Sequence, residues 1–153
     1  KKVVLFGVSY ALLDLAETNP DLSQATVIET GGMKGRRKEL TKEELHDTLK
    51  KGLIVPFISS EYGMTELLSQ GYSNKDGQFE TPAWMKIMIR EVNDPFNYLE
   101  DGKTGGINII DLANLYSCSF IATQDLGKKT SNTFQILGRF DQSDIRGCNL
   151  LVG

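Results

Sequence analysis

The sequence is poor in residue types that mark several specialised classes of protein. Of its 153 residues, only two are cysteine, one is histidine and four are proline. Two cysteines in a chain long enough to bury a core do not make a disulfide framework, so we expect Cys118 and Cys148 to be thiols. The single histidine, His46, makes neither a metal site nor a catalytic triad alone, and we expect it on the solvated face of a helix.

The chain also lacks a strong charge imbalance and long apolar runs. A net charge of -3 gives no broad basic face, so nothing electrostatic supports a nucleic-acid partner. The apolar run at 3–6 is far below the roughly 20 residues that span a bilayer, and no basic-then-apolar signal segment opens the chain. With 40% hydrophobic and 24% charged residues, the composition is that of a globular, and we expect cytoplasmic, protein.

The first half alternates short apolar runs with helical patterns. We expect strands at 3–8, 25–28 and 53–58, each a compact apolar run. We expect one helix from Ser9, as its cap, to Glu17, and a second helix that begins at the capping box of Thr41 and Glu44. This alternation predicts an α/β layer with a parallel sheet, in which ligands bind at the loops after the strands.

The second half has the pattern of a β structure. A polar, glycine-bearing loop follows Gln70, and strand candidates lie at 84–92, 107–112, 119–123 and 133–137. The predicted fold class is therefore α/β, with a partial parallel-sheet subdomain at 1–72 and a small, mostly antiparallel β subdomain at 73–140. Residues 141–153 are expected to form a hinge and a C-terminal tail.

A run of chemically useful residues, Glu61-Tyr62-Gly63-Met64-Thr65-Glu66, follows the third predicted strand, and we expect it to open a helix. Tyr62 offers a flat face for a purine, Gly63 permits close backbone approach, and Thr65 supplies a hydroxyl for phosphate. Glu66 offers carboxylate oxygen to a hard cation such as Mg²⁺. In the alternative interpretation, Tyr62 is a half-buried core residue and Thr65-Glu66 merely begins a helix.

The run at 62–66 resembles the signature of the adenylate-forming superfamily, which includes acyl-CoA synthetases. Three further runs are similar in the same order: Gly31-Gly32, Thr123-Gln124-Asp125-Leu126-Gly127, and Gly138-Arg139-Phe140-Asp141. The resemblance implies that Gly31, Gly32, Tyr62 and Gly63 line the adenine pocket, that Asp125 and Arg139 contact the ribose, and that Asp141 is a hinge. It also implies ATP or AMP as the cofactor, Thr65 at the α-phosphate and Mg²⁺ on Glu66. Gln124 departs from the expected glycine.

The runs at 29–37, 107–114 and 143–148 are similar to one branch, the acyl-protein synthetase family of bacterial bioluminescence. The resemblance implies that a fatty acid becomes an acyl-adenylate and is then passed to an enzyme cysteine and a partner reductase or other thiol acceptor. Cys148 matches the position of that cysteine, and the neighbouring Arg146 would favour its thiolate. Cys118 is expected in the core, and so is Trp84 with Met85 and Met88, although these three could line an acyl channel.

Two expected parts of such an enzyme are missing from the sequence. No lysine-containing, Ser/Thr/Gly-rich phosphate loop precedes Gly31, and only 142–153 follow the expected hinge. We therefore expect a missing N-terminal half of the same protein, and a chain that is inactive alone. We also expect the groups at positions 62, 125 and 139 to converge on one nucleoside-sized cleft.

Two alternatives to an acyl-protein synthetase stay open. An aryl- or acyl-CoA ligase of the phenylacetate type shares the adenylate motifs but transfers the acyl group to coenzyme A. A noncatalytic module that binds adenine nucleotides or docks a partner would need no reaction at all.

Overall fold

The structure is a computed structural model that describes residues 2–33, 35–38, 40–74 and 77–140. The chain divides into two compact units. The first comprises Lys1–Tyr62 and Tyr72–Gly77, and the second comprises Gly63–Gly71 and Gln78–Gly153. Each unit is described by itself, and the hinge and tail expected at 141–153 lie outside the described residues.

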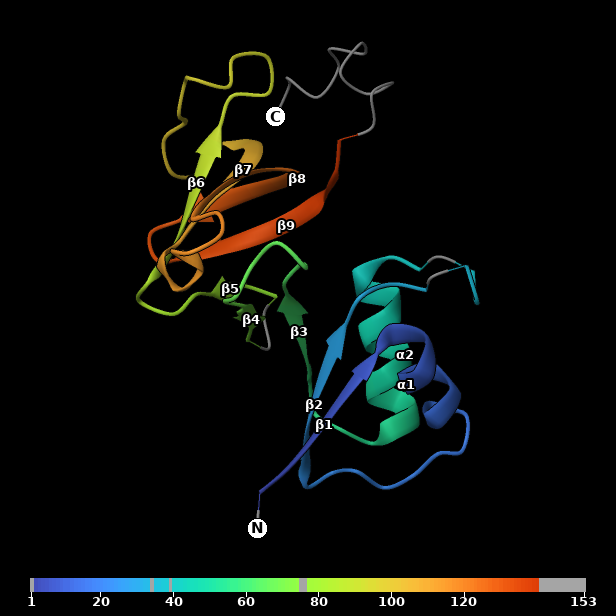
Figure 1. Ribbon diagram of the computed structural model, residues 1–153. Helices are drawn as coiled ribbons and strands as arrows, with labels where there is room; N and C mark the ends of the chain where they lie inside the picture. Colours follow the sequence, from blue (N-terminus) through green and yellow to red (C-terminus); the bar gives the residue numbers. More distant parts are fainter. Residues whose placement is uncertain (1, 34, 39, 75–76, 141–153) are drawn as a thin grey trace. The chain divides into compact units, whose positions relative to one another are not determined.

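The first unit is a layered α/β structure built on parallel strands (Figure 1). Strand β2 (Ala25–Thr30) pairs in parallel with β1 (Val3–Val8) on one side and with β3 (Ile58–Tyr62) on the other. Helix α1 (Ser9–Ala16) connects β1 to β2, and helix α2 (Lys42–Leu53) connects β2 to β3. The parallel α/β layer predicted from the alternating pattern is confirmed.

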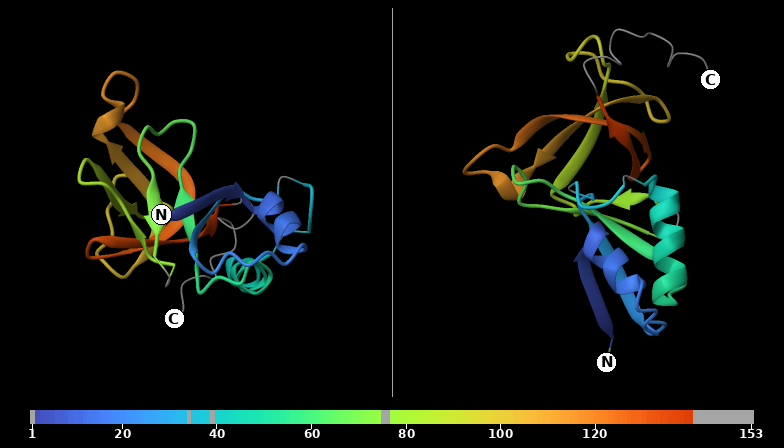
Figure 2. Two further views of the ribbon diagram at one scale, coloured as in Figure 1. Left: turned by 90° about the horizontal axis from the view of Figure 1, so that it is seen from below. Right: turned by 90° about the vertical axis from the view of Figure 1, so that its right-hand side faces the viewer.

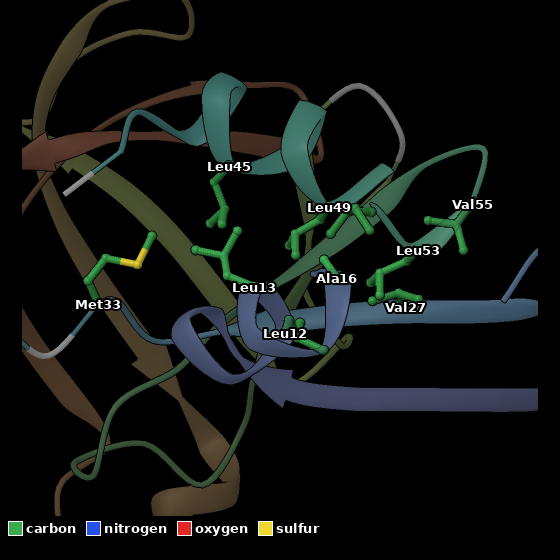
Figure 3. Close-up of a cluster of buried hydrophobic side chains, with 10 residues drawn as sticks. Leu12, Leu13, Ala16, Val27, Met33, Leu45, Leu49, Leu53 and Val55 are labelled. Atoms are coloured by element: carbon green, nitrogen blue, oxygen red, sulfur yellow. The ribbon is translucent and has the colours of Figure 1, made fainter. Parts of the chain in front are cut away.

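The two helices pack on the sheet face that carries Val27 and Ile58. These side chains are register partners in neighbouring strands, so they point to the same side. Both belong to one buried apolar cluster with residues of α1 and α2, including Leu13 and Leu49 (Figure 3). Because side chains alternate along a strand, Glu29 and Ser60 must face the same helix-covered side two residues further on.

Helix α2 begins as the sequence predicts and ends later than predicted. The Thr41 side chain accepts from the backbone N–H of Glu44, and the Glu44 side chain accepts from the backbone N–H of Thr41, so the capping box is confirmed. The strand expected at 53–58 is wrong, because Leu53 still belongs to α2 and β3 begins only at Ile58.

Gly52 lies inside α2, one residue before the helix ends. A Cβ at this position would lie 2.7 Å from the Cβ of Ala16, so this glycine permits α1 and α2 to approach closely and does not end the helix. The left-handed turn falls instead at Ile54, with a φ of 56°.

The second unit is an antiparallel sheet with the strand order β5-β9-β8-β7-β6. Its strands are β5 (Phe79–Glu80), β6 (Met85–Arg90), β7 (Thr104–Asp111), β8 (Phe120–Thr130) and β9 (Thr133–Arg139), with a 3₁₀ turn at Leu112–Asn114. A further short strand, β4 (Gly71–Ser73), falls at the division between the units. The views in Figure 2 show β7, β8 and β9 running alongside one another.

The antiparallel character predicted for the second half is confirmed, but one strand is longer than predicted. The strand expected at 119–123 ended before Gly127, yet this glycine lies inside β8. A Cβ at Gly127 would lie 2.6 Å from the Ile107 side chain of β7, so here glycine serves close packing between strands. The turn follows only at Ser131, which has a φ of 52°.

The helices of the first unit are short. In the part of the chain that the structure describes, no helix is long and apolar enough to cross a membrane.

Candidate functional site

The Gly31-Gly32 pair lies directly after β2, at the carboxyl edge of the parallel strands where the sequence predicted a ligand-binding loop. Gly31 has a φ of 70°, a left-handed conformation that glycine adopts readily. Nothing lies within 4 Å of a Cβ built on Gly32, so its backbone is open on that side. A flat ligand edge could approach this backbone closely.

Ser9 fixes the conformation of this glycine pair. Its Oγ donates to the Gly31 carbonyl at 2.8 Å and contacts Glu29 Oε2 at 2.9 Å. The prediction that Ser9 caps α1 is wrong, because the N-cap is Val8 and no side chain caps the helix. Ser9 uses its hydroxyl in a tertiary contact instead.

Glu29, which is fully buried, organises the polar groups beneath the glycine pair. Besides Ser9, its carboxylate accepts from Lys42 and from Ser60, and His46 Nε2 lies 3.6 Å from Oε1. Burial alone would raise the pKa of Glu29, but the contacts with His46, Lys42 and Ser60 outweigh it and lower the pKa to about 2. Glu29 is therefore ionised and held from both α2 and β3.

His46 is part of this network, so its predicted place on a solvated surface is wrong. Its Nε2 lies 3.0 Å from Ser60 Oγ, and its side chain is only 17% exposed. The three groups do not form a triad, because Ser60 and Glu29 both meet the same ring nitrogen, whereas a triad uses both nitrogens. Ser60 is also buried and out of reach of a substrate.

Tyr62 ends β3 and is 7% exposed, close to the alternative interpretation of a core residue. The preceding Glu61 accepts from Thr30 Oγ1 and from the Tyr72 hydroxyl, each at 2.9 Å. These contacts link β2, β3 and β4 on the sheet face opposite Glu29. The boundary between the two units falls directly after Tyr62.

Thr65 and Glu66 lie in an exposed loop, and the helix expected to begin there is wrong. The backbone N–H groups of Leu68 and Ser69 donate to Asp111 Oδ2 at 3.0 and 2.9 Å, so they are not available to a helix. Asn114 Nδ2 also donates to the Glu66 carbonyl at 2.7 Å. Asp111 and Asn114 thus anchor the backbone of the loop, while the side chains of Thr65 and Glu66 stay exposed.

Asp111 is a site residue that sequence reasoning did not single out. It is fully buried and accepts from four groups: Leu68 N, Ser69 N, Ser69 Oγ at 2.7 Å and Ala113 N at 3.1 Å. Burial would raise the pKa of Asp111, but the hydrogen bonds of Ser69, Leu68 and Ala113 lower it. The only signal in the sequence was an acidic residue at the end of an apolar strand.

Asp125 and Arg139, the predicted ribose ligands, are direct neighbours in the second unit. They are register partners across β8 and β9, and Arg139 Nε lies 3.4 Å from Asp125 Oδ1. The Asp125 side chain is 14% exposed and that of Arg139 is 73% exposed. Two residues that are 14 positions apart in the sequence thus present an acceptor and a donor side by side.

The two thiols have different outcomes. Cys118 was expected in the core, but it is exposed, and its Sγ donates to the Phe120 carbonyl at 3.2 Å. Cys148, the proposed acyl carrier, and Asp141, the proposed hinge, lie outside the described residues. Trp84 was also expected in the core and is 54% exposed, whereas Met85 is buried as predicted.

The described residues fit a magnesium ion that is held mainly by a nucleotide. They contain no cluster of three or more His, Cys, Asp or Glu that could hold a metal. Glu66 offers a single exposed carboxylate, and Mg²⁺ is usually held by one or two carboxylates together with substrate phosphates.

The fold is shared with several solved enzymes. MatB from Rhodopseudomonas palustris, solved with ATP bound, has a TM-score of 0.66 at 17% identity, over 90% of this chain and 31% of that chain. The amide bond synthetase McbA from Marinactinospora thermotolerans has a TM-score of 0.61 at 15% identity, and the match covers 90% of this chain and 31% of McbA. O-succinylbenzoate coenzyme A synthetase (MenE) from Bacillus subtilis, in complex with AMP, has a TM-score of 0.60 at 22% identity. The match covers 93% of this chain and 32% of MenE.

The chain has the fold of part of each of these solved enzymes. It spans about a third of the length of these solved structures. No family model matches the sequence, and neither does any curated protein. At this level of identity the likeness concerns the fold alone.

Proposed function

We propose that the chain is part of an ATP-dependent, AMP-forming enzyme that activates a carboxylic acid, specifically a fatty acid, and transfers the acyl group to a thiol. The observation that carries this proposal is the Asp125–Arg139 pair, because a fold found in ATP- and AMP-bound ligases presents both predicted ribose ligands side by side. A carboxylate and a guanidinium offer an acceptor and a donor to neighbouring ribose hydroxyls.

The same nucleotide needs an adenine site and a phosphate site. We assign the adenine edge to the open backbone at Gly31-Gly32 and to the ring of Tyr62 with Gly63. We assign the α-phosphate to the Thr65 hydroxyl, which is exposed on its anchored loop. Glu66 would hold Mg²⁺, which supplies charge neutralisation on the triphosphate when bound.

The proposed reaction has two steps. In the first, a carboxylate oxygen of the acid attacks the α-phosphorus of ATP, and the bond to pyrophosphate breaks. In the second, a thiolate attacks the acyl carbonyl, and AMP leaves with the electron pair of the broken C–O bond. The Thr65 hydroxyl and Arg139 would orient the nucleotide for the first step.

We propose that the thiol of the second step is Cys148, as the resemblance to acyl-protein synthetases implies. Incubation of the intact protein with ATP and radiolabelled fatty acid should then give a hydroxylamine-labile label on the protein. Cys148→Ser should remove more than nine-tenths of that label, because serine is a far weaker nucleophile than a thiolate.

Cys118→Ser is the matched control, since Cys118 is an exposed thiol of the same chain. It should leave the label unchanged. If Cys148→Ser still yields a coenzyme A ester and no protein label ever forms, the chain belongs to a coenzyme A ligase instead. If ATP binds and no carboxylate releases pyrophosphate, the noncatalytic alternative replaces both enzymes.

The described part of the first unit also supports the proposal that a further segment of the same protein covers it. Val3, Val4 and Phe6 of β1 are each about half exposed. Strands of a parallel sheet are usually buried on both faces, so these apolar side chains are unusual for an outer surface. The triphosphate loop, which the described residues do not supply, would belong to that additional segment.

A further inference from the structure

Arg90 is a buried cation that the proposed chemistry does not use. It ends β6 and is 9% exposed, in the second unit. Its Nη1 donates to the Ile107 carbonyl at 3.1 Å and to Asn108 Oδ1 at 2.8 Å, and its Nη2 donates to the Thr123 carbonyl at 2.8 Å. The guanidinium thus connects β7 and β8 through neutral oxygens.

The partners of Arg90 flank the ribose pair on both sides. Thr123 lies two residues before Asp125, and its Oγ1 accepts from the Asp125 backbone N–H at 3.1 Å. Phe140 directly follows Arg139, and its ring centroid lies 5.3 Å from the Arg90 guanidinium carbon. The Phe140 N–H also donates to the Gln124 carbonyl at 2.8 Å, which connects the two segments.

The strand ladders are irregular at this place. The register of β7 against β8 shifts between Gly106 and Asn108, and that of β8 against β9 shifts between Leu126 and Gly127. Such irregularities leave backbone groups without a regular partner and re-aim nearby side chains. Beside Asp125, side-chain hydrogen bonds therefore hold backbone groups that the irregular strand pairing does not.

Two glycines make room for this arrangement. A Cβ at Gly105 would lie 2.2 Å from the Arg90 carbonyl oxygen, and a Cβ at Gly106 would lie 2.6 Å from the Arg90 guanidinium carbon. No other residue type fits these positions without displacing Arg90 or its strand. The absence of side chains at Gly105 and Gly106 thus leaves the space that Arg90 occupies.

Burying a cation among neutral acceptors is costly, and an apolar side chain often stabilises a core as well or better. We propose that Arg90 is a positioning residue, whose fork fixes the backbone at Thr123 and Phe140 so that Asp125 and Arg139 meet the same ribose. This inference rests on the proposed function, because it names what holds the ribose pair in place.

The test compares the affinity of the intact protein for AMP and for 2′,3′-dideoxy-AMP. Hydrogen bonds to charged groups are stronger than those between neutral groups, so the wild-type protein should prefer AMP by roughly tenfold or more. Arg90→Met should reduce this preference to below about threefold and leave the affinity for the dideoxy compound within about twofold. A merely structural role would weaken both ligands equally and leave the preference unchanged, which would overturn the inference.

Three further variants make the result interpretable. Lys86→Met removes an exposed cation from the same strand and should leave the preference intact. Arg90→Lys keeps the charge and the stem without the fork, so it should lower the preference even if Arg90→Met does not fold. A wild-type preference in Arg90→Lys would contradict the inference.

Asp125→Asn separates the two hypotheses. If it abolishes the preference while both Arg90 variants keep it, the positioning role fails and the proposed function stands. If the preference is absent in the wild-type protein or survives in Asp125→Asn, the ribose assignment itself is wrong.

Discussion

Replacing Glu29 by alanine should lower the free energy of unfolding by about 3 kcal/mol at neutral pH. The change removes the acceptor that two buried hydroxyls and the Lys42 ammonium share. Removing one member of a buried charged network costs about this much, because the buried hydroxyls of Ser9 and Ser60 lose their acceptor in a place that water does not reach. Denaturant unfolding followed by circular dichroism measures the effect.

The same carboxylate predicts a specific loss of stability in acid. Its pKa is about 2 in the folded chain against an ordinary 4.5, so the unfolded chain takes up the proton first as the pH falls. The stabilisation is complete above about pH 4.5 and is lost progressively towards pH 2. At about 1.4 kcal/mol per pKa unit, the pKa difference of about 2.5 between the unfolded and folded chain corresponds to about 3–4 kcal/mol.

Two variants control this prediction. Glu29→Gln keeps the shape but cannot titrate, so its unfolding free energy should change less between pH 4.5 and pH 2 than that of the wild type. Glu17→Ala removes a carboxylate on the surface and should change little. If Glu29→Gln shows the full acid dependence, the titrating group lies elsewhere.

Asp111→Asn should destabilise the second unit by about 2–4 kcal/mol and should also impair the proposed active site. Each carboxylate oxygen of Asp111 accepts two hydrogen bonds. In asparagine an NH₂ group replaces one of these oxygens, so it would face two hydrogen-bond donors that have lost their acceptor. The loop that carries Thr65 and Glu66 would lose its attachment to β7. Thermal unfolding measures the first effect, and the rate of acyl-adenylate formation should fall by roughly tenfold or more even where the variant stays folded.

Asp101→Asn provides the matched comparison for this loop anchor. Asp101 also accepts from a backbone N–H, that of Ser131, and from Lys129, but it lies on the surface. Its replacement should have little effect on either measurement. If both variants lose equal stability and equal activity, the burial of Asp111 and its contacts with the loop do not explain the effect, which would contradict our account.

The sequence predicted the elements whose signals are local. The capping box at Thr41 and Glu44 is confirmed because all its partners lie within one turn. The strand at Val3–Val8 and the antiparallel strands of the second half are confirmed because their apolar patterns extend over several consecutive residues.

The errors concern residues that act on a distant part of the chain. The strand expected from Leu53 was wrong, because Gly52 keeps α2 in close contact with Ala16 of α1. Ser9 resembled a cap, but its hydroxyl binds Gly31 and Glu29, which are more than 20 positions away. The loop after Gly63 resembled a helix because its competing acceptor, Asp111, lies more than 40 positions further along the chain.

The candidate site was predictable only in part, for the same reason. The register of β8 and β9 shows that Asp125 and Arg139 are neighbours, whereas the sequence alone presents only their separate motifs. The supporting residues Glu29, Asp111 and Arg90 gave no comparable signal, because a buried charge is recognised by its partners and these come from other strands and helices.

The central claim is that this chain belongs to an enzyme that joins a carboxylate to AMP. Exchange of labelled pyrophosphate into ATP by the intact protein measures that step directly, because the label enters ATP only when adenylate formation reverses. We predict exchange that depends on added fatty acid and on Mg²⁺. Nucleotide binding without any carboxylate-dependent exchange, across short and long acids, would contradict the account.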